Sequence, residues 1–417
     1  MSRFLGLAIV AVIALVAAPQ SGLVQPADAF SPGMFDALTR VDNVSPDEML
    51  RRVQMQTSLL PAMRAIAARP SDFGGAEVEH DSQTYQLHIF YVTDNSSRVD
   101  VASLLPPDVP VVWTKATNSY AEIDSTAQAI ANMGESFNSV GVDVENNQVR
   151  VSLPPESAAF GDKLKTMYDL SLVNVVYEPA AGYAPTTCTN RYVCYPYRGG
   201  ILLTMDNSTS YCTWNLWAKS SNGALFGITA GHCLGTKVKQ NGDVLVDCSQ
   251  TTNCRNMQDG PSNWGSGTNG PPKSDARRFP VTNSNQGTKY NAIYKSSSEK
   301  AFTITSTVSW VDQQNGFYVC RAGKSGFNCG YIWGTTYGTI RWNGTDYGIP
   351  FKASAQLYTE GGDSGSPVLG IDTYSVDPHG LYGLATDFFN NGNGVVWSIP
   401  DDVEWDMKAN FCLSDAC

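Results

Sequence analysis

The sequence predicts an α/β domain followed by an all-β domain, and three observations support this division. All ten cysteines lie at or after Cys188. Residues 30–197 carry 11 Lys+Arg against 20 Asp+Glu, a net charge of −9, and residues 198–417 carry 16 against 18, a net charge of −2; Arg3 and Asp28 cancel, which leaves the −11 of the whole chain. Helical periodicity is found upstream of about residue 180, and short strand-like runs separated by turn residues follow it.

Residues 1–29 have the layout of a secretory signal peptide. Arg3 is followed by an apolar stretch over residues 4–18 and by the small-x-small sequence "ADA" at residues 27–29. A membrane-spanning helix is the alternative, but the apolar stretch is shorter than the roughly 20 residues that a bilayer core requires. We therefore expect a secreted protein that has no membrane segment after this peptide is removed.

The α/β domain is expected over residues 30–181. Ser45, Pro46 and Glu48 have the residue types and spacing of a capped helix start. The helix would continue over residues 51–68, with a kink or break at Pro61, because an internal proline has no amide hydrogen to donate. The other elements are expected as strands over 84–93 and 110–115, a helix over 125–137, a hairpin over 140–153 turning at Asn146–Asn147, a helix over 160–168 and a strand over 172–179.

The all-β domain is expected over residues 182–417, with its core beginning at about residue 199. The preceding residues, from Pro179 onwards, are rich in Pro, Gly, Thr and Tyr without periodicity, which is typical of a linker. Short apolar runs then alternate with Gly/Ser/Asn clusters, and no long amphipathic helix is evident before residues 400–409. This pattern is typical of a sandwich or barrel, and about 220 residues suffice for two small β domains.

The cysteines predict disulfide bonds rather than a metal site. An even number of cysteines in an exported chain indicates disulfides, although sequence alone does not give their connectivity. The spacing suggests five local pairs: Cys188 with Cys194, Cys212 with Cys233, Cys248 with Cys254, Cys320 with Cys329, and Cys412 with Cys417. A zinc site would need a close Cys/His quartet, and among the four histidines only His232 adjoins a cysteine. No metal or cofactor is expected, and the acidic balance argues against nucleic-acid binding.

The stretch "TEGGDSGSPV" at residues 359–368 presents Ser364 on a glycine-rich turn. Such a turn is either a polar surface loop or a backbone that holds one hydroxyl and neighbouring N–H groups in a working geometry. A nucleophilic serine needs a base, and the base needs an acid that orients it. His232 in "ITAGHC" is the candidate base, because a bridge between Cys212 and Cys233 would fix its position. A lone histidine is otherwise more often structural.

Asp275 is the candidate acid. It lies in "KSDARRFPV", after a Pro/Gly-rich loop and at the start of a possible strand. A solvated turn carboxylate is the alternative interpretation. The other acidic residues between His232 and Ser364 are Asp243, Asp247, Asp259, Glu299, Asp312, Asp346, Glu360 and Asp363.

The motifs "TAGHC" and "GGDSGSPV", with an aspartate between them, resemble those of the chymotrypsin-like serine proteases. The stretch "VCRAGKSGFNCG" at residues 319–330 and the long N-terminal segment are similar to the bacterial alpha-lytic protease and streptogrisin branch. The resemblance covers roughly residues 199–400. It implies two perpendicular six-stranded β-barrels with the active site in the cleft between them.

The same resemblance implies roles for individual residues. His232, Asp275 and Ser364 would form the catalytic triad, and the N–H groups of Gly362 and Ser364 the oxyanion hole. Asp363 would brace the turn by pairing with Arg321. The chain departs from the family at Ser366, where Gly is usual, and around residues 358–360 and 385–388, which are expected to line the first specificity pocket. Substrate preference is therefore left open.

The resemblance also implies partners and maturation. Residues 30–181 would be a pro-domain that acts as an intramolecular foldase and inhibitor, and the substrates would be proteins or peptides. A monomer is expected. Two other functions are alternatives. An α/β-hydrolase esterase is opposed by Ser366 and by the short spacing from Ser364 to Asp377 and His379. A catalytically inactive protease-like binding protein usually lacks a triad member.

Overall fold

The computed structural model describes residues 38–177 and 197–413, with gaps. The gaps are 95, 134, 136, 138, 206–210, 234–236, 241–242, 248–254, 257–272, 282–287, 294–301, 343–344, 355–356, 371–379 and 390–393. We call residues 38–177 the N-terminal segment and residues 197–413 the C-terminal segment. The expected signal peptide, the linker, the boundary at 181/182 and Cys188, Cys194, Cys248, Cys254 and Cys417 lie outside the described residues.

The long helix of the N-terminal segment is the expected capped helix. Helix α2 spans Pro46–Ala67, and Ser45 Oγ accepts a hydrogen bond from the Glu48 N–H at 3.3 Å. Of the expected kink or break at Pro61, the break is wrong, because the helix continues through this residue, and the kink stays a prediction. Leu59 and Met63 are buried on either side of the proline. The packing of these two side chains offsets the loss of the one backbone hydrogen bond that the proline cannot donate.

The rest of this segment is a mixture of short helices and two groups of strands. The helices are α3 (Ser96–Ala102), α4 (Tyr120–Ala131), α5 (Ala158–Met167) and the 3-10 turn η1 (Pro155–Ser157). The strands are β1 (Phe73–His80), β2 (Tyr85–Tyr91), β3 (Val111–Lys115), β4 (Ser139–Asp143), β5 (Gln148–Leu153) and β6 (Val173–Tyr177). Sequence analysis missed β1 and α3. It also began α4 five residues late, because it overlooked Ser119, whose Oγ accepts from the Glu122 N–H.

The C-terminal segment is predominantly β. Its first strands are β7 (Tyr197–Gly199), β8 (Leu202–Met205), β9 (Tyr211–Thr213), β10 (Trp217–Ser220), β11 (Leu225–Ala230), β12 (Lys237–Gln240), β13 (Asp243–Asp247), β14 (Arg255–Asn256), β15 (Ala276–Pro280), β16 (Thr288–Ile293), β17 (Phe302–Thr303) and β18 (Ser306–Thr307). After the 3-10 turn η3 (Trp310–Asp312) come β19 (Tyr318–Gly323), β20 (Gly326–Trp342), β21 (Thr345–Ser354), β22 (Pro367–Gly370), β23 (Gly380–Phe389), β24 (Gly394–Ser398), helix α6 (Pro400–Met407) and β25 (Ala409–Phe411).

These strands form several sheets. The upstream strands give a five-stranded sheet, β14-β15-β11-β10-β25, a four-stranded sheet, β13-β12-β8-β9, and a three-stranded sheet, β17-β16-β7. The downstream strands follow the order β19-β22-β23-β24-β21-β20 in a larger sheet. The all-β character agrees with the sequence prediction, and the arrangement as two six-stranded barrels stays a prediction. No helix in the described parts of the chain is long and apolar enough to cross a membrane.

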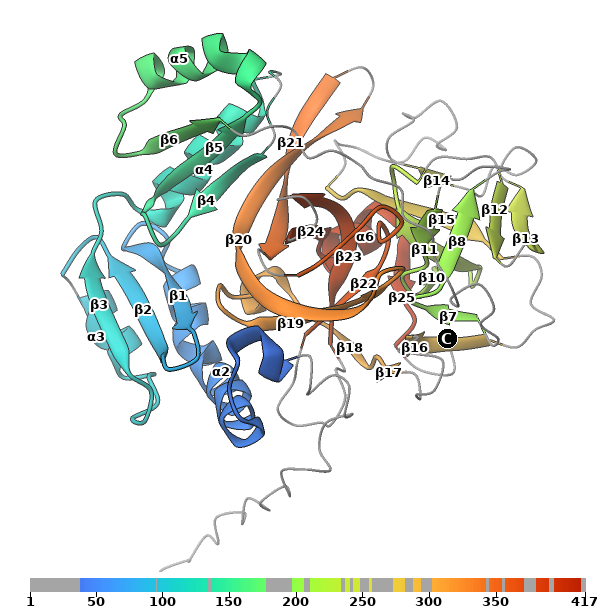
Figure 1. Cartoon of the computed structure of the whole chain (residues 1–417), viewed down its shortest axis with the longest axis horizontal. Helices are drawn as coiled ribbons and strands as arrows, with labels where there is room; N and C mark the ends of the chain where they lie inside the picture. Colours follow the sequence, from blue (N-terminus) through green and yellow to red (C-terminus); the bar gives the residue numbers. More distant parts are fainter. Residues whose placement is uncertain are drawn as a thin grey trace, which may run out of the picture.

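The larger sheet continues into the N-terminal segment. Strand β4 pairs antiparallel with β20, with Gly141 opposite Thr336 and Val140 opposite Tyr337, and β5 and β6 extend the sheet beyond β4. Figure 1 shows β4, β5 and β6 beside the long curved strand β20. A Cβ added at Gly141 would lie 3.0 Å from the Thr335 carbonyl oxygen. A glycine therefore permits the close approach of these two strands.

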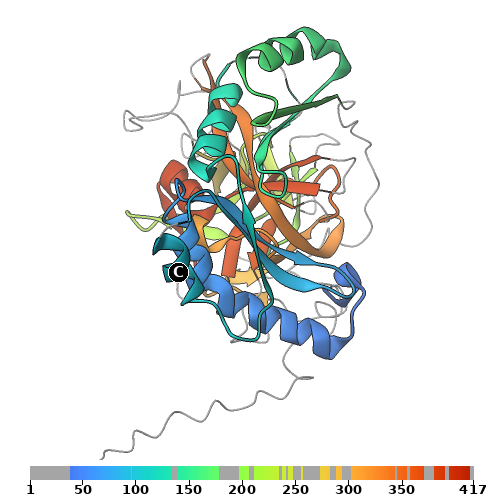
Figure 2. The same ribbon diagram turned by 90° about the vertical axis from the view of Figure 1, so that its left-hand side faces the viewer.

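The other half of the N-terminal segment packs against β19 and the turn before it. One continuous hydrophobic core contains side chains of α2, β1 and β2 together with those of the C-terminal strands. Gln56 Oε1 accepts a hydrogen bond from the Tyr318 N–H at 2.7 Å. The His80 ring lies 2.8 Å from an Asp42 carboxylate oxygen and 3.0 Å from the Gly316 carbonyl oxygen. Figure 2 shows α2 and the strands β1–β3 lying along the C-terminal segment.

Candidate active site

Strands β11 and β15 bring His232 and Asp275 together. The two strands pair antiparallel with Ala230 opposite Ala276. His232 follows the end of β11 by two residues, and Asp275 immediately precedes β15, so both lie at the same end of the pair. A Cβ added at Gly231 would lie 2.3 Å from the Asp275 Oδ1 atom. The glycine of "TAGHC" thus makes room for the carboxylate.

The three residues proposed from the sequence form one hydrogen-bonded chain. Asp275 Oδ1 accepts from the His232 backbone N–H at 2.9 Å, and Asp275 Oδ2 lies 2.6 Å from His232 Nδ1. His232 Nε2 lies 2.8 Å from Ser364 Oγ. The Asp275 side chain is buried, and the His232 side chain is 35% exposed. The buried carboxylate therefore holds the ring in place, and part of the ring is exposed.

The segment that carries Asp275 is held by α6 and by the end of β24. Asp406 Oδ2 in α6 accepts hydrogen bonds from the Lys273 N–H at 3.0 Å, the Ser274 N–H at 2.7 Å and Ser274 Oγ at 2.6 Å. The Asp275 N–H donates to Ser398 Oγ at 3.0 Å. Sequence analysis identified neither Asp406 nor Ser398, because their partners lie more than 100 residues away and no local motif marks them.

The turn that carries Ser364 rests on β9. Thr213 donates its N–H to the Ser364 carbonyl oxygen at 2.7 Å and its Oγ1 to the Gly362 carbonyl oxygen at 2.8 Å. A disulfide between Cys212 and Cys233 joins the same strand to the residue after His232. One short strand therefore fixes both the serine turn and the histidine turn.

Asp363 braces the turn from the other side. Its Oδ1 forms an ion pair with Arg321 Nη1 at 2.6 Å, and both side chains are almost completely buried. The same carboxylate accepts from the Ser325 N–H at 2.8 Å and from the Glu360 N–H at 2.9 Å. Arg321 lies on β19, next to Cys320, which is bonded to Cys329 on β20. The hairpin closed by this disulfide thereby places the Arg321 guanidinium next to the turn.

Ser366 and Lys324 make further hydrogen bonds with the turn that were not expected from the sequence. Ser366 Oγ donates to the Asp363 carbonyl oxygen and lies 3.5 Å from Arg321 Nη1, so the departure from the usual glycine gives the turn an added hydrogen bond. Lys324 Nζ donates to the Gly361 carbonyl oxygen at 2.7 Å. In the sequence, the feature that could have identified Lys324 is its place in the short loop between Cys320 and Cys329.

Some of the residues that the sequence suggested for the site lie outside the described part of the chain. Asp377, His379 and part of the expected specificity pocket lie outside the described residues or have undescribed side chains. Cys412 is disulfide-bonded, and its expected partner Cys417 is outside the described part. Within the described ranges, no group of three or more His, Cys, Asp or Glu side chains could hold a metal ion.

The arrangement provides a nucleophile, a base and an orienting acid in one line. A neutral imidazole that donates from Nδ1 to the carboxylate has a free lone pair on Nε2 for the serine proton. Gly362 has a φ of +102°, which a glycine adopts without strain. The chain of contacts is therefore suited to acyl transfer, in which a hydroxyl attacks a carbonyl carbon.

Comparison with known proteins gave structural neighbours only. No family model matches the chain, and no curated protein matches it in sequence. The Nocardiopsis protease NAPase is 19% identical with a TM-score of 0.37, and the match covers 51% of this chain and 97% of the protease. Thermobifida fusca protease A is 17% identical with a TM-score of 0.37, covering 51% and 97%. Cellulomonas bogoriensis chymotrypsin is 16% identical with a TM-score of 0.36, covering 52% and 98%.

These neighbours are bacterial proteases, and proteases of tobacco etch virus and murine norovirus are also among the structural matches. The matches concern about half of this chain.

Proposed function

We propose that this chain is a secreted serine endopeptidase that hydrolyses peptide bonds through an acyl-enzyme and is made as a precursor. The single observation that carries the proposal is the hydrogen-bonded chain from Asp275 through His232 to Ser364. A buried acid, a half-exposed imidazole and a hydroxyl at 2.6 and 2.8 Å have the geometry that nucleophilic catalysis requires.

Each residue has a defined part in the proposed reaction. Ser364 Oγ attacks the carbonyl carbon of the scissile bond while its proton passes to His232 Nε2, and Asp275 stabilises the imidazolium. The N–H groups of Gly362 and Ser364 bind the developing oxyanion. The imidazolium then protonates the leaving amine as the C–N bond breaks. A water molecule, deprotonated by His232 Nε2, then attacks the acyl carbon. The ester bond to Ser364 Oγ breaks, and the imidazolium returns the proton to Ser364 Oγ as the acid product leaves.

The precursor part of the proposal rests on the N-terminal segment. Its two halves contact the C-terminal segment through the β4–β20 pairing and through a shared hydrophobic core. Together with the apolar leader at residues 4–18 and the disulfides, this favours an exported pro-enzyme whose N-terminal segment is a pro-domain.

Ser364→Ala is the direct test. The full chain and this variant are produced in the same way and incubated with a denatured protein, and the new N-termini are counted by mass spectrometry. We expect the variant to lose hydrolysis by about a millionfold, as for other triad serines. Ser220→Ala on β10 is the matched control and should be as active as the unaltered chain. Equal hydrolysis by the unaltered chain and Ser364→Ala would contradict the proposal.

The alternative is a catalytically inactive protease-like binding protein. It predicts that the unaltered chain releases no new N-termini from any denatured protein. The intact contacts among Asp275, His232 and Ser364 favour the enzyme, because a binding protein has no need of a base aligned with a hydroxyl.

A further inference from the structure

The peptide group between Gly361 and Gly362 lies at the centre of a tight turn. The Asp363 N–H donates to the Glu360 carbonyl oxygen at 3.0 Å, which closes a β-turn with the two glycines in its central positions. The φ of +102° at Gly362 is that of a type II turn, whereas a type I turn has a negative φ there. The two turn types differ mainly by a rotation of this central peptide group through about half a turn.

The turn itself offers little resistance to that rotation. Both flanking residues are glycines, and a Cβ placed at Gly361 would meet nothing within 4 Å. The neighbouring peptide is held separately, because Thr213 Oγ1 donates to the Gly362 carbonyl oxygen. The orientation of the Gly361–Gly362 peptide must therefore be set by a contact of its own.

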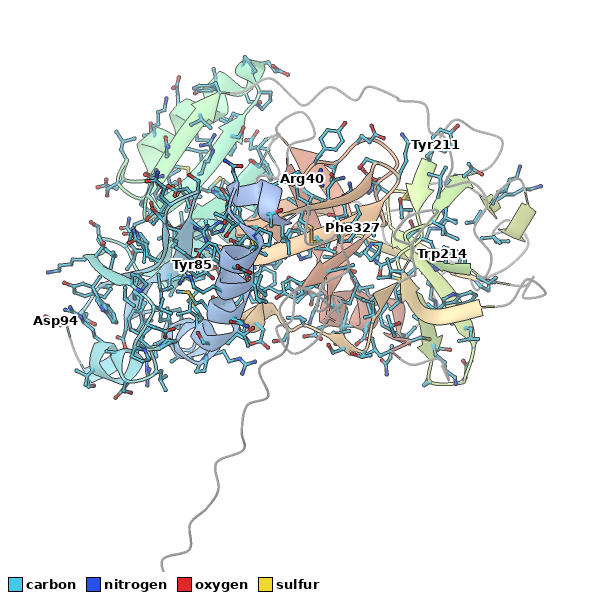
Figure 3. The ribbon with its side chains drawn as sticks, turned by 60° about the horizontal axis from the view of Figure 1, so that its bottom comes forward. Arg40, Tyr85, Asp94, Tyr211, Trp214 and Phe327 are labelled. Carbon is cyan, nitrogen blue, oxygen red and sulfur yellow. A yellow bond between two sulfur atoms is a disulfide. The ribbon has the colours of Figure 1, made fainter. Side chains whose placement is uncertain are left out.

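Lys324 makes that contact. Its Nζ donates to the Gly361 carbonyl oxygen at 2.7 Å, and its side chain is 1% exposed. The aliphatic part of the side chain packs under the turn, because a Cβ at Gly362 would lie 2.5 Å from Lys324 Cδ. The Tyr211 ring, labelled at the start of β9 in Figure 3, lies 5.7 Å from Lys324 Nζ. The ammonium is thus fixed by packing on more than one side.

A simpler role for Lys324, as a counter-ion of the turn, fits the distances less well. Asp363 already has Arg321 at 2.6 Å. Lys324 Nζ lies 3.6 Å from Glu360 Oε1, which is longer than its 2.7 Å contact with the Gly361 carbonyl oxygen. Of these two groups, the carbonyl is therefore the closer partner of the ammonium.

We propose that Lys324 is a positioning residue that holds the Gly361–Gly362 peptide with its N–H directed toward the oxyanion; this role rests on the peptidase function proposed above. In a trans peptide the C=O and N–H groups point in opposite directions, so a carbonyl bound to Lys324 directs the Gly362 N–H away from Lys324. Rotation to the type I turn would break this hydrogen bond and turn the N–H toward a buried ammonium, which repels it.

The test compares Lys324→Met with the unaltered full chain. Active sites are counted by ester burst titration, and kcat and KM are measured with a peptide anilide that the unaltered chain hydrolyses. We expect kcat to fall about tenfold or more, toward the 10²–10³-fold loss that follows removal of an oxyanion donor, with KM changed less than about threefold. Lys324→Arg retains a donor and should recover most of kcat. Lys219→Met on β10 is the matched control and should leave both constants unchanged.

Inhibitor binding separates this role from a general structural one. A peptide aldehyde forms a tetrahedral adduct with Ser364 that needs the oxyanion donors, and the matching peptide alcohol does not. Lys324→Met should weaken aldehyde binding by the same factor as kcat and leave alcohol binding unchanged. Lys324→Ala is the substitute if the methionine variant does not fold, with the same expectation.

Three outcomes would decide against the proposal or its foundation. Unchanged aldehyde affinity in either Lys324 variant would overturn the positioning role. Equal losses for aldehyde and alcohol would also overturn it, because they indicate general damage to the site. If the unaltered chain and Ser364→Ala both lack hydrolysis and aldehyde binding, the proposed peptidase function is wrong. This result differs from the first two outcomes, in which the unaltered chain is active and only the role of Lys324 is wrong.

Discussion

At the scale of single residues, the site depends on carboxylates that are fixed before any substrate arrives. Asp275 contacts both the backbone and the ring of His232, and Asp363 is paired with Arg321. Sequence analysis could select Asp275 because it precedes a strand, and the antiparallel register of β11 and β15 explains why that place meets His232. It could not find Asp406, since that contact depends on the docking of α6 against residues 273–274.

Replacing Asp275 by Asn should reduce kcat by about 10⁴-fold with little change in stability. An amide can donate to Nδ1, which favours the imidazole tautomer that places its hydrogen on Nε2 and removes the base from Ser364. The check is kcat together with the thermal midpoint of the variant. Asp401→Asn, an exposed change on α6, serves as the control. A loss below tenfold would mean that Asp275 does not orient the base.

Replacing Arg321 by Met should damage activity although Arg321 lies 43 residues before Ser364. The change leaves the buried Asp363 carboxylate without its cation, at a typical cost of about 3–5 kcal/mol. We expect a lower thermal midpoint and a lower kcat/KM, measured against Arg40→Met as an exposed control. Near-normal values for both would show that other groups satisfy Asp363.

At the scale of elements, the strands were easier to predict than their partners. The hairpin of β4 and β5 was expected from its alternation and its turn at Asn146–Asn147, and the structure has both strands. That β4 extends the sheet of β20 could not be predicted, because an edge strand shows its pairing partner only through tertiary contact. Strand β1 was missed because Gly74 and Gly75 interrupt its beginning and because glycine and glutamate are both depleted in strands.

The carboxylates near β1 make stability depend on pH. Burial, together with the negative charges of Glu145, Asp143 and Glu79, raises the pKa of Glu77 from 4.5 to about 7. Between about pH 4.5 and 7 the folded state therefore binds more protons than the unfolded state. Stability from this group is present at low pH and is lost as the pH rises through that window.

Glu77→Gln should accordingly stabilise the chain at pH 8 and not at pH 4.5. We expect a gain on the order of 2 kcal/mol at the higher pH, because the variant has no charge to bury. The check is the thermal midpoint at both pH values in a Ser364→Ala background, which prevents self-digestion. Glu156→Gln is the exposed control. An equal effect at both pH values would contradict the assigned cause.

At the scale of the whole molecule, the N-terminal segment supplies part of the surface on which the C-terminal strands are organised. It contributes three strands to the larger sheet and side chains to a common core. Some paired strands of the C-terminal segment are far apart in sequence, as for β10 with β25 and β11 with β15, and such pairing is slow to nucleate. A folded N-terminal segment that presents β4 and α2 would lower the free-energy barrier to this nucleation.

We therefore expect residues 182–417, refolded alone under oxidising conditions, to recover little activity. Adding residues 30–181 as a separate chain should restore folding and then inhibit the enzyme until the added chain is digested. Gly141→Leu in the added chain should rescue less, because a side chain there would meet the Thr335 carbonyl oxygen. Efficient refolding of 182–417 alone would leave only an inhibitory or targeting role for the N-terminal segment.

The central claim is that Ser364 is activated by His232, and covalent labelling tests it most directly. The full chain is treated with a fluorophosphonate, digested, and mapped by mass spectrometry, alongside His232→Ala and Ser364→Ala. We expect one adduct per chain, on Ser364, strongly reduced in His232→Ala and absent in Ser364→Ala. Failure of the unaltered chain to react, or equal labelling of Ser364 in the His232→Ala variant, would contradict it.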